Sequence, residues 1–216
     1  MADTGTIASL ATAGGTLVLA LATFSSTRSA NRAARVSEEA LMVGLRPVLF
    51  NARPQDPPQK VGYADNHWVR LHDGLAAVQI REDTIYLAMP LRNVAQGIAV
   101  VHGWHLTPER LLGEAPPPPL EDFRRNIRDL YVPAGDVSFW QAAVRETSDP
   151  LHEPLRAAIA EGPGITIDVL YGDHEGGQRT ITRFFLSPRS EVADDEPWMW
   201  MCSVARHWNV DRADPR

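Results

Sequence analysis

Hydrophobic and polar residues alternate along much of the chain beyond residue 46, a pattern typical of half-buried β-strands. The clearest case is TIYLAMPLRN, residues 84–93, which places four large apolar side chains on one face of an extended strand and a mixed set on the other. Pro90 lies in this segment, and proline has no backbone N–H to donate to a β-ladder. We therefore expect an edge position or a β-bulge at Pro90.

Further segments of this kind predict two hairpins and a central strand. Residues 84–93 are expected to pair with GIAVVHGWHL, residues 97–106, and ITIDVLYGD (165–173) with GQRTITRFFL (177–186) around the turn HEGG. The stretch WMWMCSVARHW, residues 198–208, is apolar on both faces at its start, which indicates a central strand. Weaker strand patterns occur at 67–71, 76–80 and 137–144.

Eight or nine short strands separated by turn residues predict a mainly β fold. An antiparallel two-sheet (Ig-like) sandwich fits best, because each strand has an apolar face that a second sheet must cover. Helical spacing of apolar residues interrupts the strands twice, at 120–130 and at 151–160. The segment APPPP, residues 115–119, predicts a stiff, extended lead into the first of these helices, either as a spacer or as a ligand for an aromatic groove on a partner.

Residues 4–27 form a stretch without any charged side chain. As an α-helix with 1.5 Å per residue this stretch would extend about 36 Å, which exceeds the roughly 30 Å hydrocarbon core of a bilayer. Its most apolar part is LVLALA, residues 17–22. A signal peptide carries its positive charges before the apolar run, whereas here they follow it. We therefore predict a transmembrane segment over residues 1–27, the first part of a long N-terminal helix.

Three arginines, Arg28, Arg32 and Arg35, follow the apolar stretch at a spacing that puts them on one face of a continuing helix. Arginines beside a membrane span hold that end in the cytoplasm, and they also attract anionic lipid headgroups. Residues 28–45 are predicted to form a helical juxtamembrane stalk, followed by a sandwich domain over 46–210 and a C-terminal tail over 211–216. The expected location is the cell membrane, single-pass, with the C-terminal domain in the cytoplasm.

Small residues spaced four apart in the apolar stretch, Ser9 with Ala13 and Ala11 with Gly15, would let two such helices pack closely in lipid. A homodimer through the N-terminal helix is therefore a further hypothesis. A soluble protein with a helical dimerisation arm is the alternative to the membrane anchor.

The charge of the chain limits its partners. The formal net charge is −6 over 216 residues, and the positive cluster lies beside the apolar stretch. An acidic body without a basic stripe repels phosphate backbones, so we expect no nucleic-acid partner. The single cysteine, Cys202, cannot form an internal disulfide, which favours a reducing compartment. In a regular strand Cys202 would face away from His207.

The sequence has no motif that would hold a catalytic serine, a nucleotide phosphate or a zinc ion, so we predict no catalytic residue and no cofactor. The best-supported metal hypothesis joins His102, His105, His207 and Asp211. His102 and His105 would face opposite sides of a regular strand unless Gly103 bulges the chain. Half-buried histidines in ordinary polar contacts are the simpler interpretation.

Six tryptophans are spread over the body: Trp68, Trp104, Trp140, Trp198, Trp200 and Trp208. Large aromatic residues fill sandwich cores, but they also mark recognition surfaces. Trp198 and Trp200 share one face of their strand. If that face is exposed, the pair forms a candidate patch for a protein partner.

Several short segments together resemble a group of single-pass, membrane-anchored β-sandwich proteins from high-GC actinobacteria. These segments are an Arg- and Ala-rich stretch that runs into LRPVLF (45–50), an LRN strand end (91–93) and a closing SVARHWNVDRADPR (203–216), behind a short apolar N-terminus. The resemblance implies a membrane anchor and a sandwich body. It implies no activity, ligand or catalytic residue.

Together these patterns predict a membrane-anchored β-sandwich module, a non-enzymatic protein-interaction or scaffold domain on the cytoplasmic face. Its partners would be the lipid bilayer, through residues 4–27, and a protein that the sequence does not identify. A metal-dependent or hydrolytic enzyme with a His/Asp site on the sandwich is the alternative function.

Overall fold

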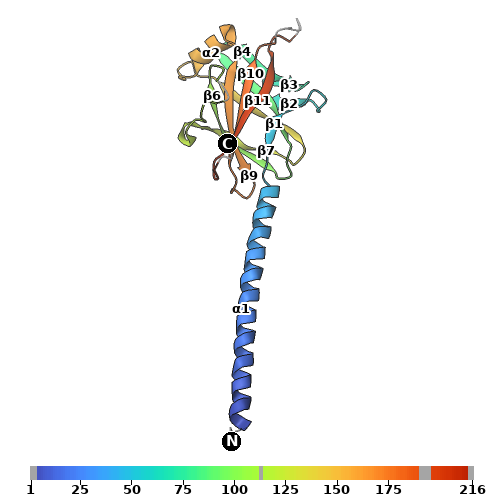
Figure 1. Cartoon of the computed structure of the whole chain (residues 1–216). Coiled ribbons are helices and arrows are strands. Elements are labelled where there is room, and N and C mark those ends of the chain that lie inside the picture. The colour runs from blue at the N-terminus through green and yellow to red at the C-terminus, as the bar shows by residue number, and fades with distance from the viewer. Residues whose placement is uncertain (1–3, 112–113, 190–195, 214–216) are drawn as a thin grey trace. The chain divides into compact units, whose positions relative to one another are not determined.

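The computed structural model of the chain describes residues 4–111, 114–189 and 196–213 (Figure 1). The chain divides into two compact units, Met1–Gly44 and Leu45–Arg216. The first unit contains the helix α1, and the second, which we call the body, contains the strands.

The helix α1 spans Thr4–Gly44, 41 residues without a proline, and ends three residues before Pro47. Its large apolar side chains point away from any protein core: Leu17, Leu19, Leu21 and Phe24 are 62–68% exposed. Within the described part of the chain, no helix combines the length and the apolar character that a membrane crossing requires. The predicted span over residues 1–27 lies partly outside the described residues, which omit residues 1–3 and the side chains of 4–13 and Val18.

The body is mainly antiparallel β-structure with few helical segments. Its strands are β1 (Leu49–Asn51), β2 (Gln59–Gly62), β3 (Trp68–Leu71), β4 (Ala76–Arg81), β5 (Thr84–Asn93), β6 (Ala99–Thr107), β7 (Arg124–Val132), β8 (Val137–Val144), β9 (Ile165–Asp173), β10 (Thr180–Ser187) and β11 (Met199–Asn209). One turn of 3-10 helix, η1 (Leu120–Asp122), and one short α-helix, α2 (His152–Glu161), interrupt them.

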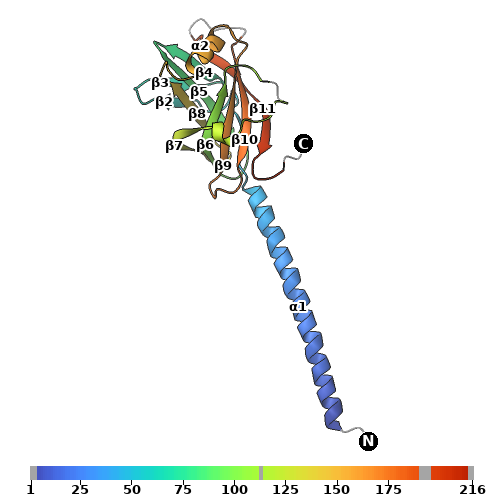
Figure 2. The same cartoon turned by 90° about the vertical axis from the view of Figure 1, so that its left-hand side faces the viewer.

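The strands form two layers that share one core. In the first layer β5 pairs with β8 along one edge and with β4 and β1 along the other. The second layer has the order β11-β10-β9-β6-β7, which Figure 2 shows side by side. Residues Met199 and Trp200 of β11 also pair with β4, so the layers are hydrogen-bonded to each other at this side. The arrangement is consistent with a β-sandwich.

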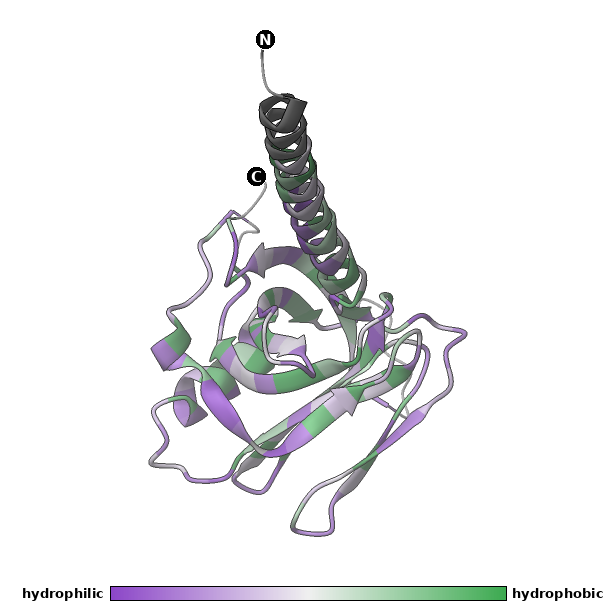
Figure 3. Ribbon diagram, turned by 90° about the horizontal axis from the view of Figure 1, so that it is seen from below, coloured by the Kyte–Doolittle hydropathy of each residue, from purple (hydrophilic) through white to green (hydrophobic). Residues whose placement is uncertain are grey.

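Because apolar and polar residues alternate along the strands, the apolar side chains of each strand lie on one face, and these faces together form the common core. Seen from below, the strands curl around a shared centre, and hydrophobic and hydrophilic positions alternate along them (Figure 3). The core takes apolar side chains from both layers, among them Leu87, Trp140 and Phe184, all fully buried. One polar contact crosses it, because the Tyr171 hydroxyl accepts the backbone N–H of Leu49 at 3.1 Å.

Both layers are also covered on their outer faces. On the first layer, the hairpin of β2 and β3 buries Tyr86 and Ala88 of β5 against Val61, Val69 and their neighbours. This cover explains why β5 is buried on both faces instead of exposing one.

On the second layer, the proline-rich segment 115–119 lies near the outer face. Arg183 of β10 donates hydrogen bonds to the carbonyl oxygens of Ala115 and Pro116, at 2.8 and 3.1 Å. The same buried guanidinium pairs with the carboxylate of Asp168 at 2.9 and 3.0 Å and lies 4.8 Å from the ring centre of Trp208. The start of this segment is therefore anchored to the body at Ala115 and Pro116.

Several predicted elements are confirmed. The segments 165–173 and 177–186 form the β9–β10 hairpin, and β11 is a central strand between β10 and β4. The weaker strand patterns correspond to β3, β4 and β8, and the second predicted helix corresponds to α2. The body begins at Leu45, and the boundary predicted at 45/46 stays a prediction.

Two predictions of local structure are wrong. The segments 84–93 and 97–106 do not form a hairpin, because β5 stays in the first layer while β6 pairs with β9 and β7 in the second. The predicted helix over 120–130 is a single 3-10 turn followed by β7. The free edge of β6 pairs with this segment at five positions, which outweighs a modest helical periodicity.

Pro90 does not lie at an edge, since β5 has neighbours on both sides. On one side the pairing with β4 ends at Ala88 and the pairing with β1 begins at Leu91. Pro90 lies between these two partners, and its carbonyl accepts the N–H of Ala52 at 3.2 Å. The missing N–H therefore falls at a gap in the ladder, where it leaves no strand residue unpaired.

Candidate functional site

Among the described residues, β7 and β8 share no backbone ladder, and they lie on the side opposite the β4–β11 pairing. The two strands are consecutive in the chain, yet β7 pairs with β6 in one layer and β8 with β5 in the other. A cleft of about 450 Å³ lies between them, and we call it the seam cleft. Its volume falls within the range of about 300–1,000 Å³ that is usual for ligand sites.

The seam is closed at one end by Asn93. The side-chain amide of Asn93 donates to the carbonyl oxygens of Val132 and Gly97, at 3.1 and 2.6 Å, and its backbone N–H donates to Asp136. Towards the other end of β7 the pairing with β6 shifts between Val101 and Gly103. The seam is thus held at one end while the ladder along β7 is interrupted beside the cleft.

Four arginines line the seam cleft: Arg124, Arg125, Arg128 and Arg145. Arg124 makes a bidentate ion pair with Asp149, at 2.6 and 2.7 Å, and Arg145 lies 3.4 Å from Asp65. These two guanidinium groups are therefore held in place at the flanks of the cleft. Because the hydrogen bonds from Arg124 stabilise its charged form, the pKa of Asp149 is lowered to about 2.

Arg125 and Arg128 are exposed at the mouth of the cleft. Across the described ranges of the chain, neither forms an ion pair or a side-chain hydrogen bond. No aspartate or glutamate is among the described residues that line the cleft. The site is therefore a local positive region in a protein whose net charge is −6, and it suits an anionic group.

Gln141 of β8 adds an acceptor to this cluster of donors. Its amide nitrogen donates to the carbonyl oxygen of Gly62 at 3.3 Å, which fixes the orientation of the amide. Its Oε1 is buried, and within the described residues it has no hydrogen-bond partner. A buried acceptor without a partner costs stability, and an N–H group of a ligand in the cleft would satisfy it.

The inner wall of the cleft is aromatic and rigid. Trp104 of β6 lines the cleft and packs edge-on against the fully buried Trp140 of β8, with ring centres 5.5 Å apart. The guanidinium of Arg124 lies over the Trp104 ring at 5.5 Å. Packing of this kind keeps the donors of the cleft in position before a ligand arrives.

The predicted metal residues are not brought together. The ladder between β6 and β9 shifts between Val101 and Gly103, so the bulge that sequence analysis required is present. His102 and His105 consequently lie on the same, outer face, where His105 faces Phe123 and where burial and the nearby Arg179 lower the pKa of His102. In a regular strand His102 and His105 would face opposite sides, so the bulge corrects that expectation.

His207 lies on the inner face of the second layer, because its Nδ1 contacts the hydroxyl of Thr182 at 2.6 Å. A second bulge, in the β10–β11 ladder, puts Cys202 and His207 on the same face, whereas a regular strand would separate them. Asp211 accepts hydrogen bonds from the backbone and side chain of Arg179.

In the described part of the chain, no three His, Cys, Asp or Glu side chains gather closely enough to hold a metal ion. The one cysteine is equally unsuited to nucleophilic chemistry, since burial raises the pKa of the Cys202 thiol to about 12.

The predicted tryptophan patch is not an exposed pair. Trp200 is 4% exposed and belongs to the common core, whereas Trp198 packs partly buried against the cluster under the β2–β3 hairpin. Trp68 is the more exposed ring, at 53%, and the ammonium group of Lys60 lies 4.6 Å from its centre.

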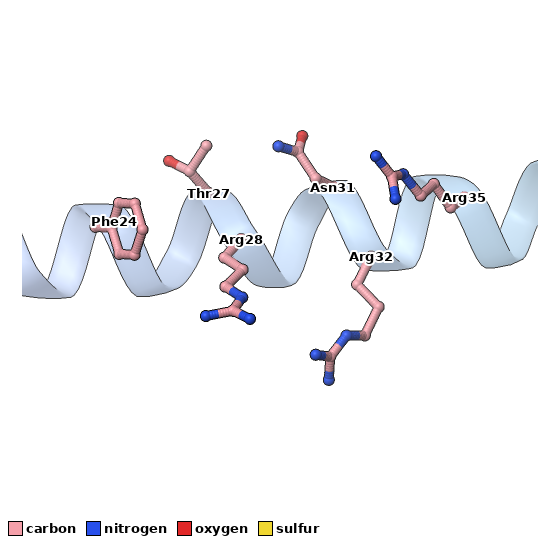
Figure 4. A pocket seen from close by; sticks show the side chains of 6 residues that line it. All are labelled: Phe24, Thr27, Arg28, Asn31, Arg32 and Arg35. Atoms are coloured by element: carbon pink, nitrogen blue, oxygen red, sulfur yellow. The ribbon is translucent and has the colours of Figure 1, made fainter.

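Arg28, Arg32 and Arg35, which the sequence predicts to lie beside a membrane, all lie on α1. Together with Phe24, Thr27 and Asn31 they line a hollow on this helix, and in Figure 4 Arg28 and Arg32 extend to the same side. All six side chains come from a single helix, so the hollow is a groove between neighbouring side chains and not an enclosed cavity.

Sequence analysis did not identify the seam cleft. The segment RRNIRDL, residues 124–130, carries the signal, because Arg124, Asn126 and Arg128 recur at every second position, the spacing that puts side chains on one face of a strand. Because the sequence predicts a helix over this segment, the row of polar residues along β7 was not recognised. In comparisons with known proteins, no family model, curated protein or solved structure matches this chain.

Proposed function

We propose that this protein is a membrane-attached, non-enzymatic interaction module that binds an anionic group of a partner in the seam cleft of its body. The observation that carries the proposal is the pair of guanidinium groups of Arg125 and Arg128, which have no partner among the described residues, beside the two positioned ones of Arg124 and Arg145. Guanidinium groups bind carboxylates and phosphates through paired, charge-assisted hydrogen bonds.

Anions that fill the cleft should stabilise the folded body. For the full chain in detergent, glutarate or phosphate at about ten times its Kd is expected to raise Tm by about 3–5 °C over KCl of equal ionic strength. The double variant Arg125→Gln/Arg128→Gln should lose this rise. Arg53→Gln/Arg70→Gln removes two exposed charges that do not line the cleft, and should keep it. An equal rise in both variants would refute an anion site in the cleft.

The attachment to the membrane is proposed from the sequence of residues 4–27 together with the exposure of Leu17, Leu21 and Phe24 on α1. Exposed large apolar side chains need a cover, and lipid supplies one. The hydroxyls of Thr23 and Thr27 donate to carbonyl oxygens one turn earlier, both at 2.8 Å, so these polar groups are already satisfied inside the helix.

We expect the full chain to sediment with membranes and to resist extraction at alkaline pH. The variant Leu17→Asp/Leu21→Asp should become soluble, because each change costs about 3–4 kcal/mol of insertion free energy. Leu41→Asp/Val43→Asp, at exposed positions near the end of the same helix, should stay with the membrane. Recovery of the wild-type chain in the high-speed supernatant would rule out the anchor.

The body is proposed to face the cytoplasm because Arg28, Arg32 and Arg35 follow the apolar stretch. A C-terminal reporter enzyme that works only outside the cytoplasm should therefore be inactive on the full chain. Full reporter activity would reverse the orientation.

A further inference from the structure

We infer that the partner group in the seam cleft is an extended acidic peptide segment, which pairs its backbone with the free edge of β8 and places its carboxylates on Arg125 and Arg128. This inference rests on the proposed function, since it names the ligand of the same site.

The first support is the pair of open strand edges at the cleft. β8 has a backbone ladder only with β5, and β7 only with β6, among the residues that the structure describes. The remaining edge of each strand faces the seam, where its N–H and C=O groups are available to an added strand. Strand addition to such an edge is a common mode of peptide recognition.

The second support is the mixture of donors and acceptors in the cleft. A free phosphate or carboxylate ion could satisfy the guanidinium groups of Arg125 and Arg128, but it has no N–H for Oε1 of Gln141. A peptide supplies both, because its backbone N–H groups donate while its Asp or Glu side chains accept. Gln141 lies on β8 itself and lines the cleft.

The third support is the contrast between the cleft and the rest of the protein. A chain with a net charge of −6 repels an acidic peptide at long range. The peptide is therefore attracted where arginines outnumber carboxylates, at the seam cleft. At about 450 Å³ the cleft accommodates a few residues, which fits a short linear motif and not a folded domain.

The test uses the full chain in detergent and three synthetic, fluorescently labelled hexapeptides. The first alternates valine and glutamate, the second replaces each glutamate by glutamine, and the third keeps glutamate but is N-methylated at alternate residues, so that one edge cannot donate. Fluorescence anisotropy is expected to show binding of the first peptide at least tenfold tighter than of the other two.

Variants of the protein test whether the glutamate peptide binds at Arg125 and Arg128. Arg125→Gln/Arg128→Gln should weaken binding of the glutamate peptide at least tenfold and leave the glutamine peptide unchanged, and Arg53→Gln/Arg70→Gln should change neither. Equal binding of the N-methylated and unmethylated peptides would overturn strand addition while leaving an anion site intact. Loss of the glutarate and phosphate effects on Tm would instead overturn the proposed function, so the two failures are distinguishable.

Discussion

Replacing Asp168 by alanine is expected to lower the free energy of unfolding of the body by about 3–5 kcal/mol. Asp168 and Arg183 are both fully buried and joined by two hydrogen bonds of 2.9 and 3.0 Å. Removing the carboxylate leaves a guanidinium group without a counter-charge in a medium of low dielectric constant. The same group holds the carbonyl oxygens of Ala115 and Pro116, so its displacement would also release the start of the proline-rich segment.

The double variant Asp168→Leu/Arg183→Met separates the contribution of the ion pair to stability from the contribution of the buried atoms at these two positions. Replacing both charges by apolar groups of similar volume removes the desolvation cost as well as the attraction, so much of the lost stability should return. Urea unfolding followed by tryptophan fluorescence measures both variants. If the single variant unfolds at the wild-type midpoint, the pair contributes nothing to the fold.

Replacing Gly97 by alanine is expected to destabilise the body by about 2–4 kcal/mol. A Cβ at this position would overlap the carbonyl oxygen of Leu45, which is backbone and cannot rotate away. The Gly97 carbonyl also accepts a 2.6 Å hydrogen bond from Asn93, the residue that closes one end of the seam. Movement of Gly97 would therefore disturb both contacts.

Gly62→Ala is the matched control. A Cβ at Gly62 would also come too close to a neighbour, at 2.6 Å from Trp68, but that neighbour is the ring of an exposed side chain. The ring can turn aside, so the loss should stay below about 1 kcal/mol. Thermal unfolding compares the two variants, and equal shifts in Tm would contradict the argument from the backbone contact.

The parts of the fold that could be predicted are those specified by local pattern. The β9–β10 hairpin combines alternation on both sides of HEGG, where Gly176 has a φ of +83°. The helix α2 and the central position of β11 follow in the same way from periodicity and from a doubly apolar start.

The parts that could not be predicted depend on which strand edge lies nearby. Residues 84–93 and 97–106 look like a hairpin, yet the chain changes layer after Asn93, whose side chain bonds to the connection and to β7. The interpretation of 120–130 as a helix fails for the same reason, because the free edge of β6 is a tertiary feature. Periodicity describes one segment and says nothing of its neighbours.

The candidate site could be predicted only in its composition. Arg124 and Arg128 are visible in the sequence, but β7 and β8 are consecutive strands joined by a short turn, and such strands usually pair with each other. Here they belong to different layers, and the space between them is the cleft. The two bulges that reset the faces of His102 and His207 likewise leave no signal in the local alternation.

The position of β11 has a consequence for biosynthesis. Its ladders join β10 of the second layer to β4 of the first, and it is the last of the described strands in the sequence. The ladder between the halves of the body therefore cannot form until this strand has been synthesised, after all the other described strands. During that interval the nascent chain exposes the edges of β4 and β10, which are open to pairing with other chains.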